Sequence, residues 1–205
     1  MQVLTLDPIA FDRHAEKLAQ IVEESCNEKF DAIVAVRRGG SFVCDAFCRH
    51  FPEDRYRSRY DVALQRPSTK RKNGKVSYLL KRLPYPILDI MRMVESTLFS
   101  LRRKIKAPTS TPSVGMPEGL IITLREKEFP NILIIDDAID SGDTLLAIAE
   151  TLRKTNENTN VRIAVLTETT SHPRIRADYS LYRNKTLIRF PWSNDYKTRL
   201  PESPL

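Results

Sequence analysis

Short, mostly apolar runs recur along the chain, and each run is followed by polar or glycine-bearing residues. Ala32 to Val36 and Ile132 to Ile135 are continuous apolar runs, and Val161 to Leu166 is apolar except for Arg162. A run of this length without alternation is typical of a parallel strand that is covered on both faces. Residues 55–64 alternate instead, which predicts a fourth strand. Two further strands are expected, at residues 119–123 and 179–182, and the chain finishes with residues 187–193 and a polar tail.

Between these runs, apolar residues recur every three or four positions, which predicts amphipathic helices. The expected helices cover about residues 12–28, 42–50, 87–105 and 145–154, and Asp7-Pro8 is a start signal for the first of them. Helices and strands that alternate in this way indicate an α/β fold, in which a mostly parallel sheet is flanked by helices. We expect a single domain over residues 1–205.

The segment at about 65–118 interrupts this alternation. Residues 65–75 are polar and basic and contain Pro67 and Gly74, which predicts a mobile loop. The 87–105 helix follows as an insertion, and residues 107–119 are a linker rich in Pro, Ser and Thr. Packing on the domain edge or dimerisation is the favoured role of the helix.

The net charge of +7 is concentrated in this region. Residues 55–106 contain fifteen Lys or Arg and three Asp or Glu, a local charge of +12, so the rest of the chain carries −5. Such a segment attracts phosphate-rich substrates, RNA or a membrane surface. A solvated loop followed by an exposed helix face accounts for the same charges at least as well.

The cysteines and the N-terminal residues indicate a cytoplasmic protein. Cys26, Cys44 and Cys48 lack the spacing of a zinc site, and the last two are four apart on a helix, as buried thiols in a reducing compartment would be. The first residues include Asp7 and Asp12 and no long apolar run, so we expect no signal peptide. We expect no membrane span either.

The chemistry is concentrated where the 132–135 strand ends. Asp136 and Asp137 follow it directly, and residues 138–144 form a short loop that contains Ser141, Gly142 and Thr144 before the next helix. Free N–H groups at a helix N-terminus bind phosphate. Two acids beside a phosphate would repel it unless they face sugar hydroxyls or hydrated Mg²⁺. The stretch therefore predicts a ribose 5-phosphate site.

A second loop has the opposite charge. Arg37-Arg38-Gly39-Gly40-Ser41 follows the 32–36 strand and leads into the 42–50 helix. Two arginines and exposed N–H groups at a strand end suit a pyrophosphate.

Together these two motifs resemble those of the type I phosphoribosyltransferases. The resemblance implies that the chain binds phosphoribosyl pyrophosphate (PRPP), with Asp136 and Asp137 on the ribose diol and on water-linked Mg²⁺. The 5-phosphate would bind to Ala138, Ile139, Asp140, Ser141, Gly142, Asp143 and Thr144. Arg37, Arg38 and Gly39 would bind pyrophosphate, and a cis peptide is expected between the two arginines.

The base half of the site resembles the purine branch of this family. An Asp at the position of Asp140 acts in the 6-oxopurine enzymes as the general base. Phe190-Pro191-Trp192 resembles the hood over the base, expected at about 168–199, with Leu187, Ile188 and Trp192 as base contacts. Two features depart from that branch, because residues 167–170 contain no Lys and Leu187 is not aromatic.

The resemblance implies transfer of phosphoribose from PRPP to a nucleobase, by a homodimer that depends on Mg²⁺. An alternative is a non-catalytic PRPP sensor that binds nucleic acid through Lys70, Arg71, Lys72 and Lys75. A third hypothesis is transfer to an unusual acceptor, with the insertion at 81–106 shaping the pocket.

Overall fold

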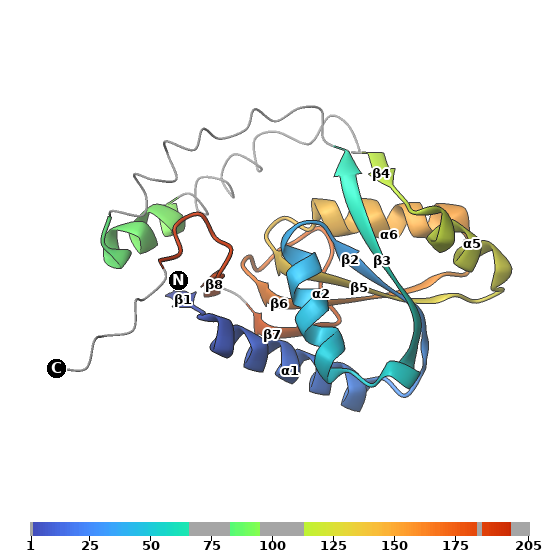
Figure 1. The fold of residues 1–205 in the computed structure, drawn as a ribbon. Helices are drawn as coiled ribbons and strands as arrows, with labels where there is room; N and C mark the ends of the chain where they lie inside the picture. Colours follow the sequence, from blue (N-terminus) through green and yellow to red (C-terminus); the bar gives the residue numbers. More distant parts are fainter. Residues whose placement is uncertain (1, 66–82, 95–112, 184–185, 198–205) are drawn as a thin grey trace.

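The computed structural model describes residues 2–65, 83–94, 113–183 and 186–197. These residues form two sheets with helices on both sides (Figure 1). The larger sheet has the strand order β4-β3-β2-β5-β6-β7. Its strands are β2 (Phe30–Val36), β3 (Tyr56–Gln65), β4 (Ser113–Gly115), β5 (Asn131–Ile139), β6 (Asn160–Glu168) and β7 (Tyr179–Arg183). The smaller sheet pairs β1 (Gln2–Thr5) with β8 (Thr186–Arg189) in parallel.

The predicted α/β fold with a mostly parallel sheet is confirmed. Within the larger sheet, the short β4 alone runs antiparallel to its neighbour. Every residue of β2 is buried, and so are the first five residues of β5. This burial on both faces explains why the two strands consist of continuous apolar runs.

Two hydrophobic cores lie on the two faces of the larger sheet. One core packs α1 (Pro8–Ser25) and α2 (Gly39–His50) against the sheet, and the other packs α5 (Glu118–Glu126) and α6 (Asp143–Thr155) against it (Figure 1). A short 3₁₀ turn, η1 (Glu53–Arg55), leads into β3. No helix among the described residues is long and apolar enough to cross a membrane.

The start of α1 follows the signal in the sequence. Asp7 is the N-cap, and its carboxylate accepts a hydrogen bond from the Ala10 N–H at 2.7 Å. Pro8 occupies the first turn, where a missing N–H costs nothing. The helix therefore begins four residues before the predicted start and ends at Ser25.

Residues 119–123, predicted as a strand, lie instead within α5, so that prediction is wrong. Leu120 and Leu124 are both fully buried, and a spacing of four places them on one helix face. The Asn156 side chain donates hydrogen bonds of 2.8 Å to the carbonyls of Leu124 and Lys127, which satisfies the end of the helix. The predicted 107–119 linker is also partly structured, because residues 113–115 pair with β3.

The inserted segment is described in part. Residues 85–94 are helical, as predicted, with Leu88 buried. The rest of the predicted 87–105 helix lies outside the described residues. So does almost all of the 65–75 loop, including the four cations considered for nucleic-acid binding.

Candidate active site

The two loops that the sequence singled out lie side by side at one edge of the larger sheet. β2 and β5 are parallel neighbours, with Ala35 opposite Ile135, so both chains leave the sheet at the same edge. Gly39 and Gly40 begin α2 there, against the acids that end β5. A side chain on Gly39 would collide with the Asp137 carboxylate, and one on Gly40 would lie 2.7 Å from the Ile135 carbonyl oxygen.

The acid pair is electrostatically costly in the absence of a ligand. Both carboxyls are half-buried, and the Asp137 N–H donates to the Asp136 carboxylate at 2.9 Å. Burial raises the pKa of Asp136 well above its ordinary value of 3.8, and the charge of Asp137 adds to the rise. Burial also raises the pKa of Asp137, against a hydrogen bond with Trp192 that lowers it. No ion pair within the described part of the chain neutralises either acid.

The loop after the acid pair is a compact turn at the start of α6. Gly142 is the N-cap of this helix and has a φ of 77°, in the left-handed region that favours glycine. A Cβ on Gly142 would also lie 2.9 Å from the Ile175 backbone nitrogen. Ser141 Oγ accepts a hydrogen bond from the Asp143 N–H at 3.1 Å. The nine residues predicted to bind PRPP, 136–144, thus form one continuous cradle of strand end, loop and first helical turn.

The loop after β6 contacts this cradle through Arg174. The Arg174 N–H donates to the Ser141 carbonyl at 2.9 Å, and the Arg174 guanidinium forms an ion pair with Asp143 at 3.1 Å. The loop that follows β6 therefore holds the backbone of the 138–144 loop in place. No local pattern in the sequence indicates this contact.

Asp140, the predicted general base, is exposed and accepts a hydrogen bond from Thr169, a residue that the sequence analysis did not predict as part of the site. The Thr169 hydroxyl donates to the Asp140 carboxylate at 2.6 Å, and the Thr169 N–H donates to the Ile139 carbonyl at 2.9 Å. Thr169 lies just beyond the end of β6, whose last residue pairs with Ile139. This parallel pairing brings the hydroxyl to the acid across 29 residues of sequence.

The cationic loop has the backbone that the resemblance implied. The peptide bond between Arg37 and Arg38 is cis, and both side chains are exposed. The Arg37 N–H donates to the Val62 carbonyl at 2.9 Å, which ties the loop to β3. Ser41 donates to Asp61 at 2.8 Å. Within the described part of the chain, no ion pair holds either guanidinium group.

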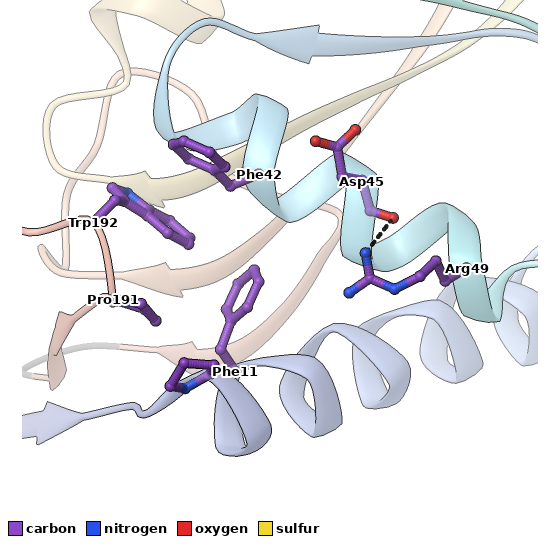
Figure 2. Close-up of a pocket in the computed structure, with 7 residues that line it drawn as sticks. Phe11, Phe42, Asp45, Arg49, Pro191 and Trp192 are labelled. Carbon is purple, nitrogen blue, oxygen red and sulfur yellow. Dashed lines mark hydrogen bonds between the residues drawn. The ribbon is translucent and has the colours of Figure 1, made fainter. Parts of the chain in front are cut away.

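The three residues predicted to contact the base are in two environments. Leu187 and Ile188 are buried within β8. Trp192 is half-buried and stacks on Phe190, with ring centroids 4.7 Å apart, and on Phe42 at 4.8 Å. With Phe11 and other residues it lines an open pocket of about 390 Å³ between the start of α1, α2 and the 191–192 loop (Figure 2).

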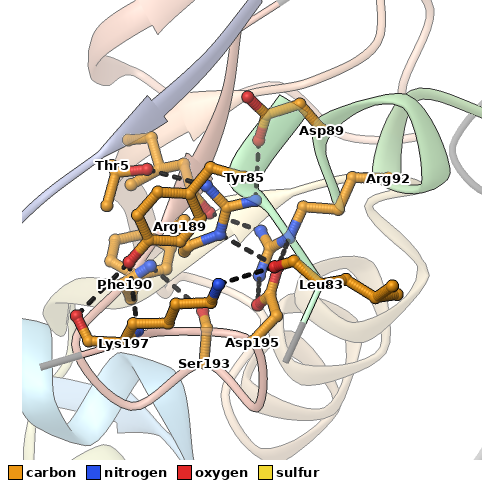
Figure 3. Close-up of polar contacts among 11 residues, drawn as sticks. Thr5, Leu83, Tyr85, Asp89, Arg92, Arg189, Phe190, Ser193, Asp195 and Lys197 are labelled. Carbon is orange, nitrogen blue, oxygen red and sulfur yellow. Dashed lines mark hydrogen bonds and ion pairs between the residues drawn. The ribbon is translucent and has the colours of Figure 1, made fainter. Parts of the chain in front are cut away.

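A buried arginine connects the predicted hood to the inserted helix (Figure 3). Arg189 is fully buried and donates to Asp195 at 2.9 Å, to Asp89 at 2.7 Å and to Thr5 at 2.8 Å. Arg92 of the inserted helix donates to the Asp195 carboxylate at 2.5 and 2.8 Å, and to the Ile188 carbonyl at 3.0 Å. The helix therefore packs on the domain edge, one of its two favoured roles, and fixes the strand that carries the predicted base contacts.

The described residues contain no group of three or more His, Cys, Asp or Glu side chains that could hold a metal ion alone. Asp136 and Asp137 offer two carboxylates, and Mg²⁺ binds with one or two protein carboxylates when substrate phosphates and water complete its shell. The donor set therefore fits Mg²⁺ bound together with a phosphorylated substrate.

Comparison with solved structures shows the same fold in proteins of low sequence identity. A purine phosphoribosyltransferase from Pyrococcus horikoshii is 18% identical with a TM-score of 0.57, over 99% of this chain and 100% of that one. The xanthine-guanine-hypoxanthine phosphoribosyltransferase of Helicobacter pylori is 17% identical with a TM-score of 0.55, over 93% and 92%. A Neisseria gonorrhoeae protein with bound ppGpp is 19% identical with a TM-score of 0.56, over 93% and 89%.

A comparison with curated protein sequences found no match. The sequence profile of the phosphoribosyl transferase domain, in contrast, matches residues 4–198, which is nearly the whole chain. The protein therefore belongs to the phosphoribosyl transferase domain family of PRPP-dependent pentosyltransferases.

Proposed function

We propose that this chain transfers the phosphoribosyl group of PRPP to a 6-oxopurine and releases pyrophosphate. The observation that carries the proposal is the contact between the cationic loop and the acid pair, where Gly39 and Gly40 lie against Asp137 and Asp136. A pyrophosphate on the first loop is then next to a ribose on the second. PRPP joins these two groups through one carbon atom, C1 of the ribose.

The chain's own residues supply binding and orientation. Asp136 and Asp137 accept hydrogen bonds from the ribose hydroxyls, and the 138–144 loop donates backbone N–H groups to the 5-phosphate. Arg37 and Arg38 stabilise the negative charge that develops on pyrophosphate as its bond to C1 breaks. Holding both ends of PRPP in this way fixes C1 in front of the acceptor nitrogen.

Magnesium fits this arrangement because two half-buried carboxylates lie side by side, and no ion pair within the described residues neutralises them. Burial raises the pKa of both carboxyls, and the charge of Asp137 adds to the rise at Asp136, so a cation beside the pair would stabilise the two charged forms. When bound, Mg²⁺ would screen the pyrophosphate charge as a Lewis acid. Asp136 and Asp137 would hold it through water.

Asp140 supports a 6-oxopurine as the acceptor. Its exposed carboxylate accepts the proton of the ring nitrogen as the bond to C1 forms, and Thr169 keeps it oriented at 2.6 Å. The similar H. pylori protein is named for three 6-oxopurines, and the P. horikoshii protein for purines. Leu187, Ile188 and Trp192 remain the proposed base contacts.

The test is pyrophosphate release from PRPP with Mg²⁺ and a panel of bases. Asp140→Asn should lower turnover by about 10²–10⁴-fold, the usual contribution of a general base, and leave PRPP affinity unchanged. Glu150→Gln is the matched control, because it removes one carboxylate from the half-exposed side of α6. No release of pyrophosphate with hypoxanthine, guanine or xanthine would overturn the 6-oxopurine assignment.

The second candidate function is a PRPP sensor that binds nucleic acid. The local charge of +12 in residues 55–106 favours it. Replacement of Lys70, Arg71, Lys72 and Lys75 by Gln should then abolish a salt-dependent affinity for RNA or DNA. The proposed homodimer is tested by sedimentation, and the proposed cytoplasmic location by cell fractionation.

A further inference from the structure

Two thiols of α2 lie in contact with each other, and neither belongs to the residues proposed to bind PRPP. Cys44 and Cys48 are one helical turn apart, and their sulfur atoms form a hydrogen bond of 3.9 Å. Both are free of disulfides. Cys44 is fully buried, whereas Cys48 is half-buried and reaches solvent. The site proposed above uses neither thiol.

The surroundings favour the thiolate of Cys48 over that of Cys44. The hydrogen bond from Cys44 lowers the pKa of Cys48, and the Arg59 guanidinium and the Tyr56 hydroxyl add to the effect against burial. Arg59 is held beside α2 by an ion pair with Asp45 at 2.5 Å. The same hydrogen bond and burial raise the pKa of Cys44. A part-exposed thiol beside a cation is the environment in which cysteines react.

Cys26 provides the contrast within the chain. It is buried, and its thiol donates to the Glu28 carbonyl at 3.7 Å instead of contacting another sulfur. Among the three cysteines, Cys48 alone combines exposure with a second sulfur in contact.

We propose that Cys48 is a modification site for hydroperoxides and that Cys44 is its resolving thiol. The Cys48 thiolate attacks one peroxide oxygen, the O–O bond breaks, and the leaving oxygen takes a proton from solvent to form water or an alcohol. Cys48 is then a sulfenic acid. The Cys44 sulfur attacks Cys48, the S–O bond breaks, and the hydroxyl leaves as water with the Cys44 proton. The two sulfurs lose two electrons, which the peroxide gains.

The cross-link requires a local change in α2. Cβ atoms four residues apart on a helix are about 5–6 Å apart, but a disulfide needs about 3.5–4.5 Å. Because α2 ends at His50, two residues after Cys48, opening its last turn is sufficient. That turn is attached to α1 through Asp12, which pairs with Arg49 at 2.5 Å and with His50 at 3.1 Å. The Arg49 contact joins exposed groups and the His50 contact a half-buried ring, so both are weak, whereas Phe47 in the same turn is fully buried and stays in the core while residues 48–50 open.

The experiment treats the full-length protein with hydrogen peroxide and identifies the products by intact mass and peptide mapping. The wild-type protein should lose two hydrogens and yield a linked Cys44–Cys48 peptide. Cys44→Ser should instead leave a sulfenic acid on Cys48 that dimedone traps, and Cys48→Ser should give neither product. Cys26→Ser is the matched control and should behave like the wild type.

A measurement on the wild-type chain avoids any dependence on how the variants fold. Iodoacetamide should alkylate Cys48 several-fold faster than Cys26 and Cys44. Equal rates at the three thiols, or peroxide-treated protein without the Cys44–Cys48 link, would overturn the proposal. Neither result depends on whether the protein turns over PRPP.

Discussion

Replacing Gly40 by alanine tests the contact on which the proposed site depends. The new Cβ would lie 2.7 Å from the Ile135 carbonyl oxygen, 2.9 Å from the Asp136 Cα and 2.9 Å from the Asp136 Oδ1. Two of these atoms belong to the backbone of β5, so they cannot swing aside as a long side chain can. The cationic loop and the acid pair must therefore separate.

The size of the separation sets the expected effect. An ordinary contact begins at 3.4 Å, so the loop must move by roughly 0.7 Å from 2.7 Å. Overpacking of this kind costs about 1–3 kcal/mol. For a chain of this length each kcal/mol lowers the melting temperature by about 2–4 °C, which gives a drop of about 2–12 °C. A misplacement near 1 Å costs on the order of 10²-fold in a catalytic step, so the loss of turnover should approach that value.

Two measurements check the prediction: thermal melting followed by circular dichroism, and calorimetric titration with PRPP and Mg²⁺. PRPP affinity should fall, because its two binding loops move apart. Gly119→Ala is the control, since its Cβ would meet only the Tyr60 ring, at 3.0 Å, and alanine favours a helix by about 0.5–1 kcal/mol. Wild-type melting and PRPP affinity in Gly40→Ala would refute the reasoning.

The electrostatics of the site and of the hood give two further predictions. Asp136→Asn should raise the stability of the ligand-free protein by about 1 kcal/mol and abolish the thermal shift produced by PRPP with Mg²⁺. The pKa of Asp136 is raised above 3.8 in the folded state, so the folded protein retains a proton that the unfolded chain releases. The wild type should therefore lose stability relative to the variant as the pH rises from about 4 towards 7. Melting curves across this pH range test the prediction, and a variant that melts lower than the wild type at every pH contradicts it. Arg189→Met removes the hydrogen bonds to Asp195, Asp89 and Thr5 and leaves the buried Asp195 with Arg92 as its one cationic partner among the described residues, so it should cost about 3 kcal/mol, or roughly 6–12 °C. Arg49→Met breaks only an exposed ion pair, with side chains 58% and 38% accessible, and should change stability by less than about 1 kcal/mol; equal melting of the two arginine variants would argue against the buried network.

The sequence alone determined the central strands and placed the acid pair and the 138–144 loop at the end of one of them. β2 and β5 are buried on both faces, so their side chains are apolar without alternation, and this is visible in the sequence. The cradle at residues 136–144 is contiguous, so its acids, glycine and hydroxyl groups could be recognised together. The start of α1 could also be predicted, because Asp7 caps a helix through a contact three residues away.

Where burial came from distant partners, the sequence was misleading or silent. The Ile-rich stretch in α5 has strand propensity, but the helix buries Leu120 and Leu124, and packing outweighs intrinsic preference. β1 was not predicted, because a four-residue strand has little pattern of its own. Its partner is β8, about 184 residues later in the chain.

The tertiary structure alone decided which residues meet at the site. Parallel pairing of β2 with β5 placed Gly39 and Gly40 against the acid pair, and pairing of β5 with β6 brought Thr169 to Asp140. These partners are separated by 29 to about 100 residues of sequence, and local propensities do not report contacts between residues so far apart in the chain. Composition and periodicity report the environment of each residue, whereas the order of strands in the sheet, which follows from packing of the whole chain, determines its neighbours.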